Sequence, residues 1–96
     1  MIAIVATLRV HDGKGPDLEK TFLELMGKVR ADEPGNLVYQ LAKSRTEPNT
    51  YKVLELYRDQ AALEAHRGSA HFKGAGPALG ACLAGRAEIE YLDAVV

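Results

Sequence analysis

The 96-residue sequence has little cysteine and no excess of charge of either sign. A single cysteine, Cys82, excludes an intrachain disulfide, and the residues around it are not typical of a zinc site. We therefore expect a protein of a reducing compartment, the cytoplasm. The 12 basic and 13 acidic residues are spread along the chain and give a net charge of -1, which disfavours nucleic acid and membranes as partners.

Long apolar runs and phosphate-binding loops are also missing. The apolar stretch from Met1 to Leu8 is too short to cross a bilayer and lacks the flanks of a signal peptide, which favours a buried strand. No glycine-rich phosphate loop and no convincing set of metal ligands occurs, so we expect no metal, flavin or haem cofactor. The length predicts one domain over residues 1–96. A domain this small buries only about 60–70% of its unfolded surface, so a partner subunit would help it.

The spacing of apolar residues predicts the element order β-α-β-β-α-β, with the second helical region divided at Gly68. A stripe at helical spacing, Leu18 to Val29, indicates a helix that begins near Pro16 and stops before Pro34. Asp59 and Ser69 are suited to cap the two later helical segments. Strands are predicted over residues 2–10, 37–43, 51–58 and 86–92, and helical segments over 60–67 and 69–83, the last kinked or divided by Gly74, Gly76 and Pro77.

This order is typical of the ferredoxin-like α+β fold, an antiparallel four-stranded sheet with its helices on one face. The first strand is apolar on both faces, and Leu54 and Leu56 lie on the opposite face of their strand from Val53. A monomer would expose a wide apolar patch on the face without helices. We therefore predict a homodimer, in which two sheets pack face to face as a dimeric α+β barrel.

Two histidines, His66 and His71, flank the predicted helix break. On one continuous helix, residues five apart do not share a face, but a turn at Gly68 allows the two imidazoles to converge on one pocket. Imidazole suits proton transfer near neutral pH. The alternative is that His66 packs against the sheet and His71 is partly exposed at a helix start. No third ligand lies nearby in sequence, so the pair gives little support to a metal site.

Glu55 is a charge in a mostly apolar strand, where an unpaired carboxylate is rare. It either orients a histidine or accepts a proton, or it forms an ion pair with Lys52, Arg58 or Arg86. The segment Glu33-Pro34-Gly35-Asn36 has the chemistry of a turn, from which Asn36 could offer an amide to a substrate carbonyl. The four tyrosines, which could line an aromatic pocket or simply fill strands, are Tyr39, Tyr51, Tyr57 and Tyr91.

Several of these segments together resemble the antibiotic-biosynthesis-monooxygenase superfamily: Glu33 to Tyr39, Tyr51 to Tyr57 with Glu55, His66, and Ser69 to Phe72. The resemblance implies a dimeric α+β barrel with a pocket between sheet and helices in each subunit. Haem degradation is not expected, because the chain has no tryptophan and has Ala6-Thr7-Leu8 where that branch carries an asparagine. The pattern is most similar to the quinol-monooxygenase and autoinducer-2-degrading isomerase branches.

We therefore predict a cofactor-independent monooxygenase that oxidises a small electron-rich aromatic, a quinol, with dioxygen. The alternatives are an isomerase of a small phosphorylated dione and a dimer that binds a small molecule without catalysis. His66 is the predicted acid/base centre, supported by Glu55 and His71. The predicted substrate-binding residues are Asn36, Tyr39, Tyr57 and Phe72.

Overall fold

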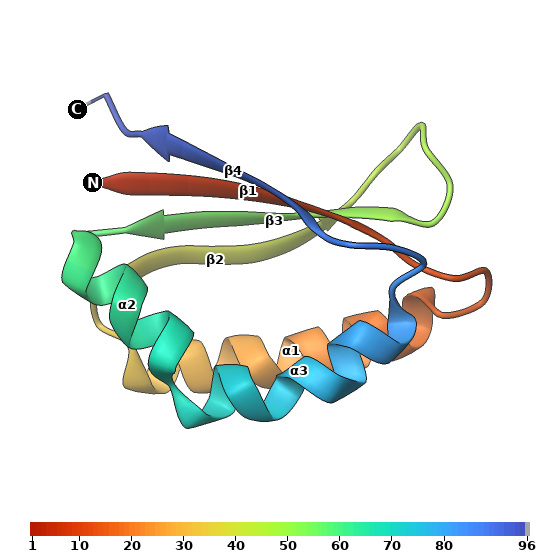
Figure 1. Cartoon of the computed structure of the whole chain (residues 1–96), viewed down its shortest axis with the longest axis horizontal. Helices are drawn as coiled ribbons and strands as arrows, with labels where there is room; N and C mark the ends of the chain where they lie inside the picture. Colours follow the sequence, from red (N-terminus) through yellow and green to blue (C-terminus); the bar gives the residue numbers. More distant parts are fainter. Residues whose placement is uncertain (96) are drawn as a thin grey trace.

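The computed structural model describes residues 1–95 as one sheet with its helices gathered on one face (Figure 1). The face opposite the helices is left uncovered in the single chain. In chain order the elements are β1 (Ile2–Arg9), α1 (Gly15–Asp32), β2 (Asn36–Lys43), β3 (Thr50–Tyr57), α2 (Gln60–Gly68), α3 (Ala70–Cys82) and β4 (Glu88–Asp93).

The strands form an antiparallel sheet in the order β2-β3-β1-β4, which confirms the predicted ferredoxin-like α+β fold. Strand β1 is central, and Ile4 lies opposite Glu55 on one side and Tyr91 on the other. The register between β2 and β3 shifts between Asn36 and Val38, so Leu37 is an extra residue at a β-bulge. The bulge lies where the chain enters the sheet from α1.

Helix α1 follows the predicted apolar stripe. Its buried residues are Leu18, Phe22, Leu25, Met26 and Val29, the set that the sequence spacing indicated. Pro16 lies in the first turn, where a missing backbone N–H costs nothing. The stripe packs on the sheet and supplies five of the twelve buried residues of the main core.

The two later helices are separated by one extended residue, Ser69, as predicted. The Asp59 carboxylate accepts a hydrogen bond from the Ala62 N–H (2.9 Å), and the Ser69 hydroxyl accepts one from the Phe72 N–H (3.2 Å). The second segment is not divided into two pieces, because α3 is continuous through Pro77. Pro77 and Lys73, whose carbonyl loses its partner, are both exposed, so water can satisfy that carbonyl.

No helix within residues 1–95 has the length and apolar character that crossing a bilayer requires.

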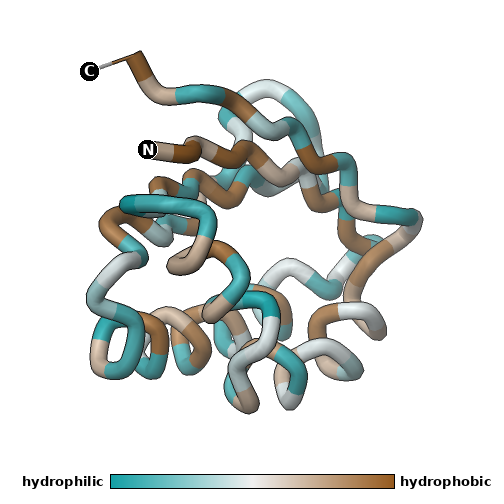
Figure 2. The backbone as a smooth tube through the Cα atoms, turned by 60° about the vertical axis from the view of Figure 1, so that its left-hand side comes forward, coloured by the Kyte–Doolittle hydropathy of each residue, from teal (hydrophilic) through white to brown (hydrophobic). Residues whose placement is uncertain are grey.

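The face of the sheet without helices is partly apolar. Leu54 and Val38 are each 42% exposed and Leu92 is 41% exposed, and all three alternate with residues that face the helices. Figure 2 shows hydrophobic colouring along much of the N-terminal strand. On the same face, the Lys52 ammonium donates a hydrogen bond to the Thr7 hydroxyl (2.6 Å).

Candidate active site

A tight turn joins α1 to β2 and presses against α2. A Cβ atom added at Gly35 would lie 2.6 Å from the Ala62 Cβ, so only glycine allows this approach. The Arg58 backbone N–H donates to the Gly35 carbonyl (2.8 Å) and ties the turn to the end of β3. The Glu33 N–H donates to the Val29 carbonyl (2.9 Å) and ends the helix. The turn therefore holds the Glu33 side chain beside α2.

We expect Gly35→Ala to lower the free energy of unfolding by about 1–3 kcal/mol, because the added methyl group has no space against Ala62. Gly27→Ala is the matched control. A Cβ at Gly27, in the middle of α1, meets nothing within 4 Å, so alanine there should stabilise the protein by about 0.5–1 kcal/mol. Urea unfolding of both variants measures the difference. Equal stabilities would contradict the close approach of the turn to α2.

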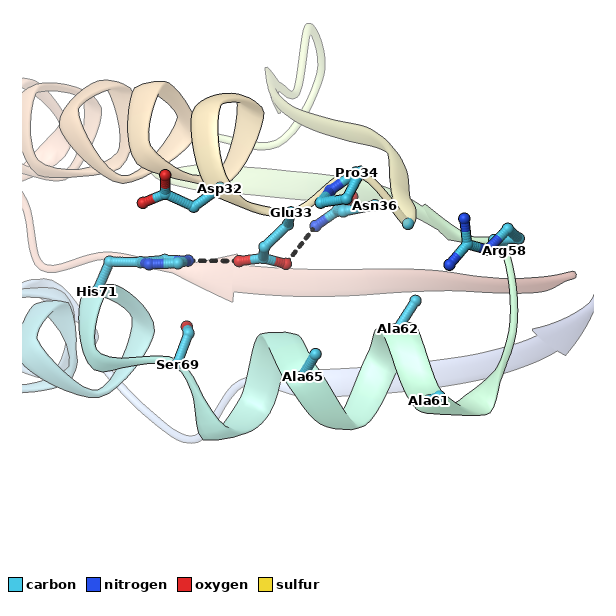
Figure 3. A pocket seen from close by; sticks show the side chains of 11 residues that line it. Asp32, Glu33, Pro34, Asn36, Arg58, Ala61, Ala62, Ala65, Ser69 and His71 are labelled. Atoms are coloured by element: carbon cyan, nitrogen blue, oxygen red, sulfur yellow. Dashed lines mark hydrogen bonds and ion pairs between the residues drawn. The ribbon is translucent and has the colours of Figure 1, made fainter.

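The carboxylate of Glu33 is the centre of a buried polar cluster, seen in part in Figure 3. The His66 Nδ1 lies 3.0 Å from both Glu33 oxygens, and the His71 Nε2 makes a hydrogen bond to Oε2. The Asn36 amide donates a further hydrogen bond to Oε1 (3.2 Å). His66 is 3% and Glu33 8% exposed, so these interactions form largely out of water. The cluster is stabilised by charge-assisted hydrogen bonds.

Burial and hydrogen bonding act in opposite directions on the pKa values of this cluster. Burial raises the pKa of Glu33, but the hydrogen bonds from His71, His66 and Asn36 outweigh it and lower the pKa overall. Burial lowers the pKa of His66, and the neighbouring Glu33 carboxylate only partly offsets this. At neutral pH, Glu33 is therefore ionised and His66 is neutral. With Nδ1 facing the carboxylate, the neutral imidazole is held as the Nδ1–H tautomer.

His66 and His71 approach each other across the extended residue Ser69, but they meet on the carboxylate of Glu33, which sequence reasoning missed. The sequence pattern around Glu33 indicates only a turn. It lies 33 residues before His66 and 38 before His71, and a glutamate before Pro-Gly at a helix end carries no local sign of burial. The alternative for His66, packing against the sheet, also holds, since its ring contacts Tyr39 and Tyr57.

An apolar cavity of about 340 Å³ lies between the sheet and helices α1 and α3, apart from the Glu33 cluster. All four strands contribute side chains to it, and Gly76 and Gly80 of α3 line it without a side chain. Its volume is that of a small-molecule site. The apolar and aromatic side chains that define it include Leu8, Phe22, Tyr39, Phe72, Leu79 and Ile89.

Glu55 is the one carboxylate among the described residues that line this cavity. Its Oε1 accepts a hydrogen bond from the hydroxyl of Tyr57 (2.6 Å), a fully buried residue. The alternative for Glu55, an ion pair with Lys52, Arg58 or Arg86, is not formed within residues 1–95. Lys52 lies an odd number of residues away in the strand and faces the other side of the sheet, and Arg58 pairs with Asp59 (3.5 Å). Nor does Glu55 orient a histidine, because Glu33 bonds to both.

The structure divides the predicted site residues between two places. Tyr39, Glu55 and Phe72 line the apolar cavity, whereas Asn36 and His71 line a polar pocket of about 280 Å³ beside Glu33. His66 lies between them: it bonds to Glu33, and its ring is 4.9 Å from that of Tyr39 and 4.6 Å from that of Phe72. Tyr57 is buried beside Ile4 and Leu63 and lines neither pocket. The seven predicted site residues therefore do not line one common pocket.

This domain is a ferredoxin-like α+β domain with an apolar cavity between its sheet and its helices. A carboxylate lies in the cavity wall, and a separate Glu-His-His cluster is buried nearby. The chain belongs to the antibiotic biosynthesis monooxygenase family, whose profile matches residues 1–77.

Individual relatives agree with this assignment. The chain is 35% identical to the Bacillus subtilis protein "Putative monooxygenase YcnE" over 74 residues, 77% of each chain. The crystal structure of a "putative antibiotic biosynthesis monooxygenase" from Caulobacter crescentus is 55% identical, with a TM-score of 0.96 over 99% of this chain and 90% of that one. A conserved protein from Methanosarcina mazei is 27% identical, with a TM-score of 0.89 over 95% and 89% of the two chains. The names of the first two of these relatives describe them as "putative" monooxygenases.

Proposed function

We propose that this protein is a monooxygenase that oxidises a small electron-rich aromatic, a quinol, with dioxygen in the apolar cavity. Glu55 is the proton acceptor. The observation that carries the proposal is the position of this carboxylate, which lines a cavity otherwise made largely of apolar and aromatic side chains. A base in such a place can deprotonate a bound hydroxyl group while the cavity limits the access of water.

The carboxylate of Glu55 has one oxygen committed and one available. Oε1 accepts the Tyr57 hydroxyl, and no residue within 1–95 donates a hydrogen bond to Oε2. Burial raises the pKa of the Tyr57 hydroxyl far above its usual range, and the hydrogen bond to Glu55 adds to this, so Tyr57 remains a donor. Oε2 is the atom that takes the substrate proton. The aromatic rings of Tyr39 and Phe72 hold the substrate against it.

The substrate supplies all the electrons of this reaction. Proton transfer from a quinol hydroxyl to Glu55 leaves an electron-rich anion, which reduces dioxygen directly. One oxygen atom forms a bond to a ring carbon, which loses its hydrogen, and the other leaves as water. The quinol becomes a hydroxyquinone, so the four electrons that dioxygen takes come from the ring and no external reductant is consumed.

Oxygen uptake tests the proposal. The purified protein is incubated with a panel of hydroquinones and, separately, with a small phosphorylated dione. Oxygen consumption and hydroxyquinone formation with a hydroquinone support it. Conversion of the dione without oxygen uptake would show that the protein is an isomerase and contradict the proposal. Binding of a compound from either class without turnover would show that the protein binds small molecules without catalysis.

We expect turnover to fall on acidification with a midpoint above pH 4.5. Burial raises the pKa of Glu55 above 4.5 and the charge of Glu33 adds to the rise, although the Tyr57 hydrogen bond and the Arg67 charge oppose them. The working form is the ionised one, so activity is present above this raised pKa and is lost as the pH drops through it. The measurement is kcat/KM against pH, which reports the free enzyme.

The charged and titratable groups around Glu55 supply a control for this pH profile. Arg67 of α2 favours the ionised form of Glu55, so Arg67→Gln should move the midpoint to higher pH. Lys73 also lines the cavity, from an exposed position on α3, and Lys73→Gln tests whether it contributes. A midpoint at or below pH 4.5 with a hydroquinone that does not itself titrate there would contradict the assignment of Glu55.

A further inference from the structure

The cluster at Glu33 has the composition of a metal site as well as the hydrogen bonds already described. Nitrogen atoms of His66 and His71 and the carboxylate of Glu33 all lie within 4.8 Å of one another. Two imidazoles and one carboxylate are a ligand set of zinc and other divalent transition metals. The sequence offered only the two histidines, and the third ligand comes from the turn after α1, 33 residues before His66.

We propose that Glu33, His66 and His71 bind a divalent transition metal ion of the zinc type, through His66 Nδ1, His71 Nε2 and the Glu33 carboxylate. An ion of this kind binds its ligands tetrahedrally at about 2.0–2.2 Å, so two ligand atoms on it lie about 3.3–3.6 Å apart. The donor atoms all lie within 4.8 Å of one another, so each needs to shift by on the order of 1 Å to bind one ion. The side chain of His71, 12% exposed in the first turn of α3, is the least confined of the three.

A second observation concerns Asn36, which lies beside the three ligands. Its amide nitrogen donates to Glu33 Oε1 (3.2 Å), which orients both the amide and the carboxylate. Its Oδ1 atom is buried and has no hydrogen-bond partner within residues 1–95. A buried acceptor without a donor is costly and calls for an explanation. A water molecule bound to the ion would be a donor of the right kind, and the ligand orientation that Asn36 provides is typical of residues behind metal ligands.

The site is preformed and accessible from one side. Hydrogen bonds already gather the three ligands, so binding exchanges N–H···O contacts for bonds to the ion without rebuilding the fold. The polar pocket of about 280 Å³ opens on Glu33 and His71 and is lined by Ser69 and Arg58 (Figure 3). It provides the entry path and the space for water in the open coordination positions. This pocket is distinct from the apolar cavity that contains Glu55.

Metal binding is measured directly, without any assay of turnover, so its outcome is separate from that of the proposed oxidation. The purified protein is stripped with a chelator and dialysed against Zn²⁺, and the bound metal is quantified. Co²⁺ is used in parallel, because its visible absorption reports nitrogen and oxygen ligands. We expect one equivalent of metal and a melting temperature that rises with Zn²⁺ concentration.

Four variants locate the site. His71→Ala and Glu33→Gln should abolish stoichiometric binding and the cobalt spectrum, and Asn36→Ala should weaken binding about 10–100-fold. His11→Ala is the matched control, since His11 is exposed in the turn after β1 and should leave binding unchanged. Circular dichroism and melting without metal show which variants are folded. Failure of the parent protein to bind Zn²⁺ or Co²⁺ would overturn the proposal, as would full binding by a folded His71→Ala or Glu33→Gln variant.

Discussion

Glu55→Gln is expected to lower turnover of an active hydroquinone by about 10²–10⁴-fold, the usual contribution of a positioned general base. Glutamine has nearly the same shape and can still accept the Tyr57 hydrogen bond, but it cannot take a proton from the substrate. The loss should therefore appear in kcat as well as in kcat/KM. The melting temperature should not fall, because the variant removes a partly buried charge.

The matched control is Glu64→Gln, the same chemical change at an exposed position of α2. It should retain the kcat of the parent protein. Full activity in a folded Glu55→Gln variant would contradict the role given to Glu55. In that case His66, which contacts Tyr39 and Phe72 behind the cavity wall, would be the next candidate for the proton acceptor.

The second large effect concerns the face of the sheet without helices. We expect the parent protein to be a homodimer of twice 10.4 kDa and Leu54→Asp to be a monomer. Leu54 is 42% exposed on this face in the single chain. A dimer closed through this face would bury the leucine in the parent protein, whereas in the variant it would have to bury a charged aspartate. Because the dimer is twofold symmetric, each interface contains two substituted residues, one from each subunit. We expect a cost of about 3–6 kcal/mol, which is about 10²–10⁴-fold in the dissociation constant.

Light scattering at micromolar concentration measures the mass of both proteins. Leu23→Asp is the control, because Leu23 is a 63% exposed leucine on α1, on the other side of the molecule from the open face. This variant should remain dimeric. A parent protein that is a monomer at these concentrations would remove the argument for the barrel, and a dimeric Leu54→Asp would place the interface elsewhere.

Periodic and local features could be predicted from the sequence alone. The stripe from Leu18 to Val29 predicted the buried face of α1, because helical spacing needs no knowledge of the partner surface. Alternation in β3 likewise assigned Val53 to the core and Leu54 to the open face. The caps at Asp59 and Ser69 were predicted because each bonds to an amide three residues ahead in its own helix. These interactions are short in sequence, so they and the family pattern were sufficient for the fold.

Only the tertiary structure decided which groups meet. Glu33, not Glu55, is the partner of His66 and His71, because the turn at Gly35 packs tightly on α2 and brings together residues more than 30 apart in sequence. The separation of the apolar cavity from the polar pocket has the same origin, since it depends on how helices and sheet pack. The spacing of residues in the sequence indicates the periodicity of each helix or strand, but not the distance between two such elements. A site built from several elements depends on that distance.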